Sequence, residues 1–217
     1  MQNRLLLAAS AVLLCAVPAS AQFYSYPAFQ PPQIADREFN FAVADGGRSG
    51  TSLLVQWREG LSRGSEFRLD AGIADPEGRG ASSRLILGGS WGYQLHQGSN
   101  DVPLAIQFTA GLGGSFGGGQ SLLRIPAGLS VGHRFDLEGG ISVMPFAHPR
   151  ISLDTCNECG RNGRRDTDIG VDVDLGVDVR FTRAIAVRAA AMLGGSDFQG
   201  RQDAVGIGLI WSPPSLR

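Results

Sequence analysis

Two cysteines spaced C-x-x-C are the residues of this chain best suited to redox or metal chemistry. Cys156 and Cys159 lie in the segment DTCNECGRNGRRDT, residues 154–167. In an exported protein such a pair oxidises, which predicts a local disulfide in a long exposed loop. A zinc site needs further ligands, and neither a second C-x-x-C nor a nearby histidine supplies them. Thiol redox catalysis needs a helix N-terminus that lowers the thiol pKa, and the sequence predicts no helix there.

His148 and Arg150 are the next candidates, as part of a hydrolytic site that acts on lipid or peptide. No serine nucleophile or second acid with a recognisable spacing accompanies them, so a hydrogen-bonded buried histidine is the favoured interpretation. The segment GSFGGGQS, residues 114–121, lacks the lysine and the following helix of a phosphate-binding loop and is expected to be a surface turn. We therefore predict no catalytic residue, no metal site and no cofactor.

The stretch TDIGVDVDLGVDVRF, residues 167–181, carries aspartates at a regular spacing. Its Gly-x-Asp units lack the paired glycines and the longer period of calcium-binding repeats. Aliphatic residues occupy every odd position from Ile169 to Val179, while Asp168, Asp172, Asp174 and Asp178 lie at even positions. This alternation predicts a strand with one aliphatic face and one acidic face.

The N-terminal segment, residues 1–21, has the pattern of a cleaved secretory signal. A cationic start at Arg4 and an apolar block precede the small-residue site that ends at Ala21. The apolar block is too short for a membrane-spanning helix. We expect an exported chain with an irregular, proline-rich N-terminal arm at 22–36, a barrel domain at 37–212 and a tail at 213–217.

Alternation with a period of two continues through most of the remaining chain. It predicts about ten strands, with eight as the alternative, and no helix. A formal net charge of −1 and a charged fraction of 18% do not suggest a nucleic-acid partner. The 31 glycines favour turns and close strand packing over helices. The predicted strands are residues 38–45, 51–59, 65–74, 83–96, 102–114, 121–135, 140–153, 167–181, 183–194 and 203–212.

Alternation alone does not separate a membrane barrel from a soluble sandwich or lipocalin-like barrel, because all of them alternate. Loop length is one discriminating feature: connections after even-numbered strands should be short, and the long connection at 154–167 follows the seventh strand. A second feature is a band of aromatic residues on the apolar face toward one end of the strands, as expected at a lipid headgroup boundary. This aromatic belt comprises Trp57, Phe67, Trp91, Tyr93, Phe135, Phe181 and Trp211.

Opposite charges on the non-apolar face are the third feature. The lumen of a small barrel is filled by side chains, where an unpaired charge would be costly, so arginines and aspartates should meet there. The predicted lumen charges are Arg68, Arg124, Arg134, Arg150, Asp172, Asp174, Asp178 and Arg188.

Together these features make the chain, from Asp36 to Trp211, resemble the bacterial outer-membrane β-barrel superfamily of small single-chain barrels. The last strand, DAVGIGLIW, adds to the resemblance, which implies that Trp211 is the aromatic residue that the barrel assembly machinery recognises, although SPPSLR follows it. The implied fold is an all-β, antiparallel, up-and-down transmembrane barrel in the outer membrane of a Gram-negative-type cell.

The expected role is structural or one of surface interaction, with a lumen filled by paired arginine and aspartate side chains. The expected partners are the lipid bilayer and the assembly machinery, and the barrel is expected to be a monomer. The alternatives are a narrow solute or ion channel, an outer-membrane hydrolase, and a soluble periplasmic β-protein.

Overall fold

The structure is a computed structural model that describes residues 26, 28–46, 50–61, 64–76, 82–99, 101–157, 165–196, 200–201 and 203–214. The expected signal segment and its cleavage site at Ala21 lie outside these residues. Within the described part of the chain, no helix is long and apolar enough to span a bilayer. The elements are β1 (Arg37–Asp45), β2 (Thr51–Leu61), β3 (Ser65–Asp75), β4 (Arg84–Gln97), β5 (Ala105–Gly117), β6 (Gln120–Gly132), β7 (Phe135–Asp136), η2 (Glu138–Gly140), β8 (Ser142–Asn157), β9 (Asp166–Arg180), β10 (Ile185–Ser196), β11 (Gly200–Arg201) and β12 (Ala204–Trp211).

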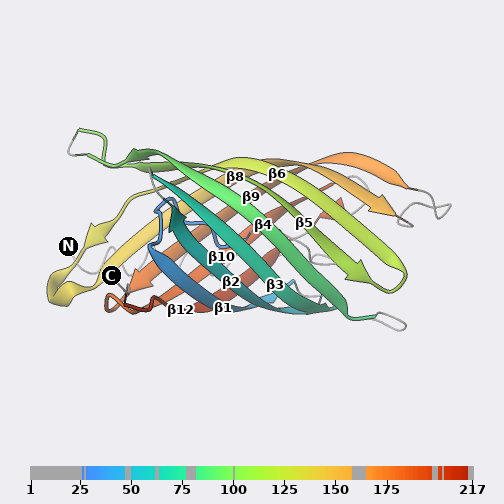
Figure 1. Cartoon of the computed structure of the whole chain (residues 1–217), viewed down its shortest axis with the longest axis horizontal. Coiled ribbons are helices and arrows are strands. Elements are labelled where there is room, and N and C mark those ends of the chain that lie inside the picture. The colour runs from blue at the N-terminus through green and yellow to red at the C-terminus, as the bar shows by residue number, and fades with distance from the viewer. Residues whose placement is uncertain are drawn as a thin grey trace.

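The strands form one closed antiparallel barrel (Figure 1). Each long strand pairs with its neighbours along the chain, and β1 closes the ring by pairing with β12 as well as β2. At this seam Phe39 lies opposite both Trp57 and Trp211. Of the twelve strands in the described part of the chain, β7 and β11 have two residues each, which leaves ten long strands in the wall. The predicted antiparallel barrel of about ten strands is confirmed.

The two faces of each strand differ sharply in exposure. On β9, Val171 is 59% exposed on the outer surface, whereas its neighbour Asp172 is 2% exposed and points into the lumen. The same rule holds around the ring, where the large exposed hydrophobic side chains are on the outward positions. A soluble β-protein would place such residues inside, so this barrel is inverted relative to a soluble one.

The strands begin and end within a few residues of the predicted positions, with two informative differences. β8 continues to Asn157 and β9 begins at Asp166, so the segment predicted as a loop at 154–167 is partly strand. The connection after β6 is longer than expected, because it contains the short strand β7 and the 3₁₀ turn η2. Gly118 and Gly119, both with positive φ, form the tight turn between β5 and β6.

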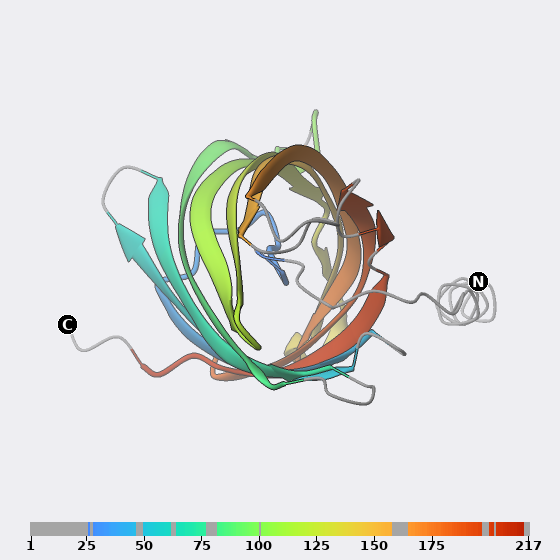
Figure 2. The same cartoon turned by 90° about the vertical axis from the view of Figure 1, so that its right-hand side faces the viewer.

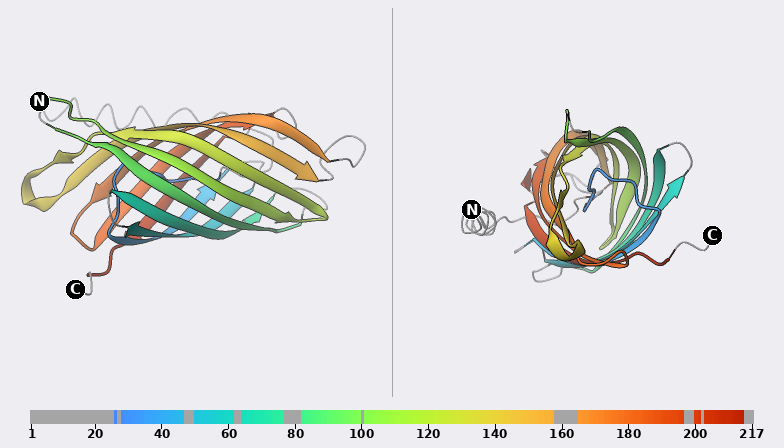
Figure 3. Two further views of the ribbon diagram at one scale, coloured as in Figure 1. Left: turned by 45° about the horizontal axis from the view of Figure 1, so that its top comes forward. Right: turned by 90° about the vertical axis from the view of Figure 1, so that its left-hand side faces the viewer.

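The N-terminal arm lies inside the barrel. Figures 2 and 3 show the blue segment before β1 within the ring of strands. Its described part, Tyr26 and residues 28–36, contains no helix or strand, and Tyr26, Ala28, Phe29 and Gln30 are buried. The predicted irregular arm thus lies in the lumen and fills it. The sequence did not indicate this position.

Candidate functional site: the lumen and its arm

The inward positions of the strands supply two clusters of buried charges. We call the first the arm-side cluster; its residues are Glu38, Arg58, Glu66, Arg68, Asp178 and Arg188. We call the second the wall cluster; its residues are Arg124, His148, Arg150, Asp154, Asp172 and Asp174. All of these side chains are buried.

Arginines and carboxylates alternate in the arm-side cluster. Arg58 pairs with Glu38 at 3.1 Å and with Glu66 at 3.0 Å. Glu66 also pairs with Arg68, whose guanidinium donates to Gln107 at 2.5 Å. Arg188 lies 3.0 Å from Glu38 and 2.6 Å from Asp178. Most of these groups thus have two oppositely charged partners each. This pairing compensates for the free-energy cost of removing the charges from water.

Adjacent strands hold the wall cluster together. Arg124 on β6 pairs with Asp154 on β8 at 2.6 Å and with Asp172 on β9 at 3.3 Å. Arg150 pairs with Asp174 at 2.6 Å and lies 3.7 Å from Asp172. The strand register explains these contacts, because Arg124 lies directly opposite Asp154 and Arg150 directly opposite Asp172.

His148 has hydrogen-bonding partners but no exposed surface. Its Nε2 lies 2.8 Å from the Oγ1 of Thr109, and its Nδ1 lies 3.7 Å from Asp174. The hydroxyl of Thr109 also lies 3.4 Å from the carbonyl of Gly128. A general base must reach a substrate proton, and this imidazole is enclosed by the wall. The geometry is that of a buried histidine that links β8 to the neighbouring β9 and, beyond β6, to β5.

The arm is held by its main chain. Five lumen side chains donate to its carbonyl oxygens: Gln56 to Ala28 at 3.2 Å, Arg188 to Phe29 at 3.3 Å, Ser130 to Gln30 at 2.5 Å, Gln94 to Pro32 at 2.9 Å and Arg58 to Gln33 at 2.5 Å. In the opposite sense, the amide N–H of Ala35 donates to Glu66 at 3.0 Å. These bonds satisfy backbone groups that the arm carries into a space away from bulk water.

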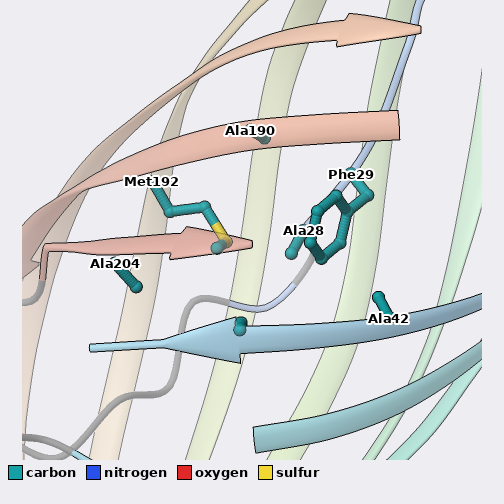
Figure 4. Packing of buried hydrophobic residues seen from close by; sticks show 7 residues of the cluster. Ala28, Phe29, Ala42, Ala190, Met192 and Ala204 are labelled. Carbon is teal, nitrogen blue, oxygen red and sulfur yellow. The ribbon is translucent and has the colours of Figure 1, made fainter. Parts of the chain in front are cut away.

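Two aromatic rings of the arm occupy spaces that glycines leave open. Phe29 packs with Ala28, Ala42, Ala44, Ala190, Met192 and Ala204, as the close-up in Figure 4 shows for most of these residues. A Cβ on Gly206 would lie 2.6 Å from the Phe29 ring. Tyr26 belongs to a second apolar cluster, and a Cβ on Gly88 would lie 2.3 Å from its ring. Some of the glycines in the wall therefore make room for the arm.

Most predicted lumen charges do lie in the lumen, but Arg134 does not. Arg134 follows β6, its side chain is 44% exposed, and it pairs with the exposed Asp136 at 2.8 Å. The strand predicted at 121–135 ends at Gly132 in the structure. Arg134 therefore lies outside the strand, and the alternation of the strand no longer directs its side chain into the lumen. The set of predicted lumen charges also missed Glu38, Arg58, Glu66 and Asp154. Glu38, Arg58 and Glu66 share the inward parity of Asn40, Gln56 and Arg68, and this signal was available in the sequence.

The aromatic residues of the predicted belt gather at the end of the barrel where β1 begins. Strand pairing brings Phe67 opposite Trp91, and the rings of Phe39 and Trp211 stack at 5.6 Å. Trp57 donates from Nε1 to Glu59 at 3.1 Å. Phe135 pairs with β8 near the same end, and Phe181 directly follows β9. Contact of this band with lipid headgroups stays a prediction.

Cys156 is in a different setting from the one predicted. It is disulfide-bonded, but it lies on β8 with its side chain fully buried beside Tyr26 and Leu122. Cys159, its predicted partner, lies outside the described residues. Among the described residues, no group of three or more histidine, cysteine, aspartate or glutamate side chains is arranged to hold a metal ion.

A closed ring of strands, an apolar exterior and a lumen of paired charges together decide the architecture. The protein is a transmembrane β-barrel of the outer-membrane type. Its location is therefore the outer membrane, as the sequence predicted.

Comparisons with known proteins add no functional assignment. No protein-family model matches the chain, and no curated protein matches it. Among solved structures, the barrel is similar to a bacterial polysaccharide outer membrane secretin, with a TM-score of 0.48 and 9% identity over 84% of this chain and 67% of the other. It is also similar to the β domain of the Bordetella autotransporter BrkA, with a TM-score of 0.48 and 14% identity over 82% of this chain and 98% of the other. Neisserial surface protein A (NspA) matches with a TM-score of 0.30 and 12% identity over 82% of this chain and 94% of the other.

Proposed function

We propose that the protein is a closed outer-membrane barrel with a structural or surface-interaction role. The observation that carries this proposal is the filled lumen. The arm-side and wall clusters are buried ion pairs, and Tyr26 and Phe29 of the arm pack against apolar residues of the lumen. Free diffusion of solutes would require these groups to separate. The loops that would meet the environment are those near 154–167 and 195–202.

Planar-bilayer recording tests this proposal directly. The full mature chain, refolded and inserted into a bilayer, is expected to give no steady conductance. Steady conductance would contradict a closed barrel and support the alternative of a narrow ion passage. In that case the replacement of Asp172 and Asp174 by asparagine would abolish the conductance if the wall cluster lines the path.

We propose further that the barrel is not an enzyme, that it is a monomer, and that Trp211 is read by the barrel assembly machinery. Trp211 ends β12 and has an exposed side chain, so its ring is available to a partner. Trp211→Ala should lower the amount of folded barrel in the outer membrane. Trp91→Ala, which removes an equally outward indole away from the last strand, is the matched control. Equal yields from the two variants would argue against recognition of Trp211.

The hydrolase alternative has its own test. Activity of the purified barrel on lipid A or on peptides, lost in His148→Ala, would support an enzyme and contradict the structural role.

A further inference from the structure

The wall of the barrel is complete without the arm. β1 begins at Arg37, and its pairings with β2 and β12 involve no residue of the described arm. The arm is attached to the wall by side-chain bonds to its main chain and, at the barrel entrance, by one bond from the Gly60 N–H to the Asp36 carbonyl at 3.0 Å. Removing the arm would therefore leave every interstrand ladder intact.

The charged groups that hold the arm also have partners in the wall. Arg58 keeps Glu38 and Glu66, and Arg188 keeps Glu38 and Asp178. Glu66, which accepts the bond from Ala35, keeps Arg58 and Arg68. Because loss of the arm would not strip these ions of their counter-charges, the large cost of an isolated buried charge does not oppose release.

The contacts define what this site recognises. Five side-chain donors bond to the carbonyl oxygens of Ala28, Phe29, Gln30, Pro32 and Gln33, which any polypeptide following the same irregular path would present. Pro31 and Pro32 have no N–H, so this part of the arm brings fewer buried donors that need an acceptor. Selectivity comes from the two ring sockets, one at Gly88 for Tyr26 and one at Gly206 for Phe29.

We propose that the lumen is a peptide-binding site for an irregular segment with two aromatic side chains three residues apart, and that the arm, of which Tyr26 and residues 28–36 are described, is its releasable resident ligand. The site recognises the main chain and the two aromatic rings of the ligand, and it does not require a charged side chain on the ligand. This inference goes beyond the proposed surface role and has a different test, because peptide binding tests the inference and conductance tests the closed barrel.

A chain that lacks residues 22–36 provides the test. The mature barrel beginning at Arg37 is refolded in detergent micelles, and a fluorescently labelled peptide with the sequence of residues 22–36 is added. Fluorescence anisotropy is expected to show saturable binding that the unlabelled peptide competes away. A peptide with alanine in place of both Tyr26 and Phe29 should bind at least about tenfold more weakly, since it loses both buried rings.

Two adjacent glycines provide a matched pair of barrel variants. The nearest atoms to a Cβ on Gly88 all belong to Tyr26, so Gly88→Leu in the arm-free barrel should fill the socket and weaken peptide binding at least about tenfold. Gly89 faces outward, where an added Cβ would make ordinary contacts with Leu69 and Phe67, so Gly89→Leu should bind like the parent. An arm-free barrel that folds but shows no saturable binding, or equal affinities for the two variants, would overturn the proposal.

The full chain provides a second readout if the arm-free chain does not refold. In a folded barrel, Gly88→Leu should eject the arm and expose the Phe29–Gln30 bond to chymotrypsin, whereas Gly89→Leu should leave it protected. Protection of the arm in both folded variants would also overturn the proposal.

Discussion

The arm-side cluster and the wall cluster satisfy their charges in different ways. In the wall cluster, the pairs described join side chains of β6, β8 and β9, for example Arg124 with Asp154. In the arm-side cluster, Arg58 and Arg188 divide their donors between carboxylates and carbonyl oxygens of the arm. Both clusters come from the same inward parity of the strands. The wall cluster therefore pairs its charges within the wall, whereas the arm-side cluster also bonds the main chain of the arm.

Loss of an ion-pair partner within the wall cluster should destabilise the barrel most. Arg124→Met leaves Asp154 buried without the arginine that lies opposite it, and it should lower the free energy of unfolding by about 3–5 kcal/mol. The midpoint of urea unfolding in micelles measures the change. Arg124→Met combined with Asp154→Leu should recover part of the loss, because an apolar pair replaces the orphaned carboxylate. A loss below about 1 kcal/mol for the single variant would mean that water enters and solvates the cluster.

A double-mutant cycle measures how strongly each cluster is coupled to the arm. Arg188 donates to the Phe29 carbonyl, so removal of residues 22–36 and Arg188→Met should be coupled by about 0.5–3 kcal/mol. Removal of the arm and Arg124→Met should instead be additive within about 0.5 kcal/mol. Unfolding midpoints of the single and combined variants supply both coupling energies. Equal coupling energies for the two arginines would mean that the two clusters do not differ in their dependence on the arm.

An added methyl group tests how tightly the arm is seated. A Cβ at Gly206 would lie 2.6 Å from the Phe29 ring, so Gly206→Ala should destabilise the full chain by about 1–3 kcal/mol. In the arm-free barrel the same change should cost less, because the ring is absent. Gly89→Ala is the control in both backgrounds, since its added methyl meets neighbours at 3.5 Å or more. If Gly206→Ala lowers the free energy of unfolding by the same amount after removal of the arm, the added methyl group clashes with Ala44 and Val43 of the wall and not with Phe29.

The smallest effect is expected outside the lumen. Arg134→Met removes the exposed pair with Asp136 and should change the free energy of unfolding by only about 0–1 kcal/mol, with the difference declining as salt is raised. Urea unfolding at low and high ionic strength measures both quantities. A loss as large as that of Arg124→Met would place Arg134 with the buried charges after all.

Much of the wall could be predicted because a strand's alternation is a local property. Residues 167–181 alone indicate which side chains of β9 face lipid and which face inward, and the strand is observed at Asp166–Arg180. The error at Arg134 and the omission of Asp154 have the same cause. Arg134 lies beyond the observed end of β6, and Asp154 lies just past the predicted end of its strand but within β8, so both depend on where a strand ends. That end depends on pairing with the neighbouring strand more than on the residue itself.

The period of two within each strand was sufficient to predict about ten strands, their two faces and the presence of opposite charges inside. Which charges meet depends on the pairing of strands in the folded barrel, since Arg124 reaches Asp154 through the register between β6 and β8. The position of the arm inside the lumen also depends on the folded barrel. The arm has no periodic pattern, and its place depends on spaces at Gly88 and Gly206, which come together with the arm only when the barrel closes.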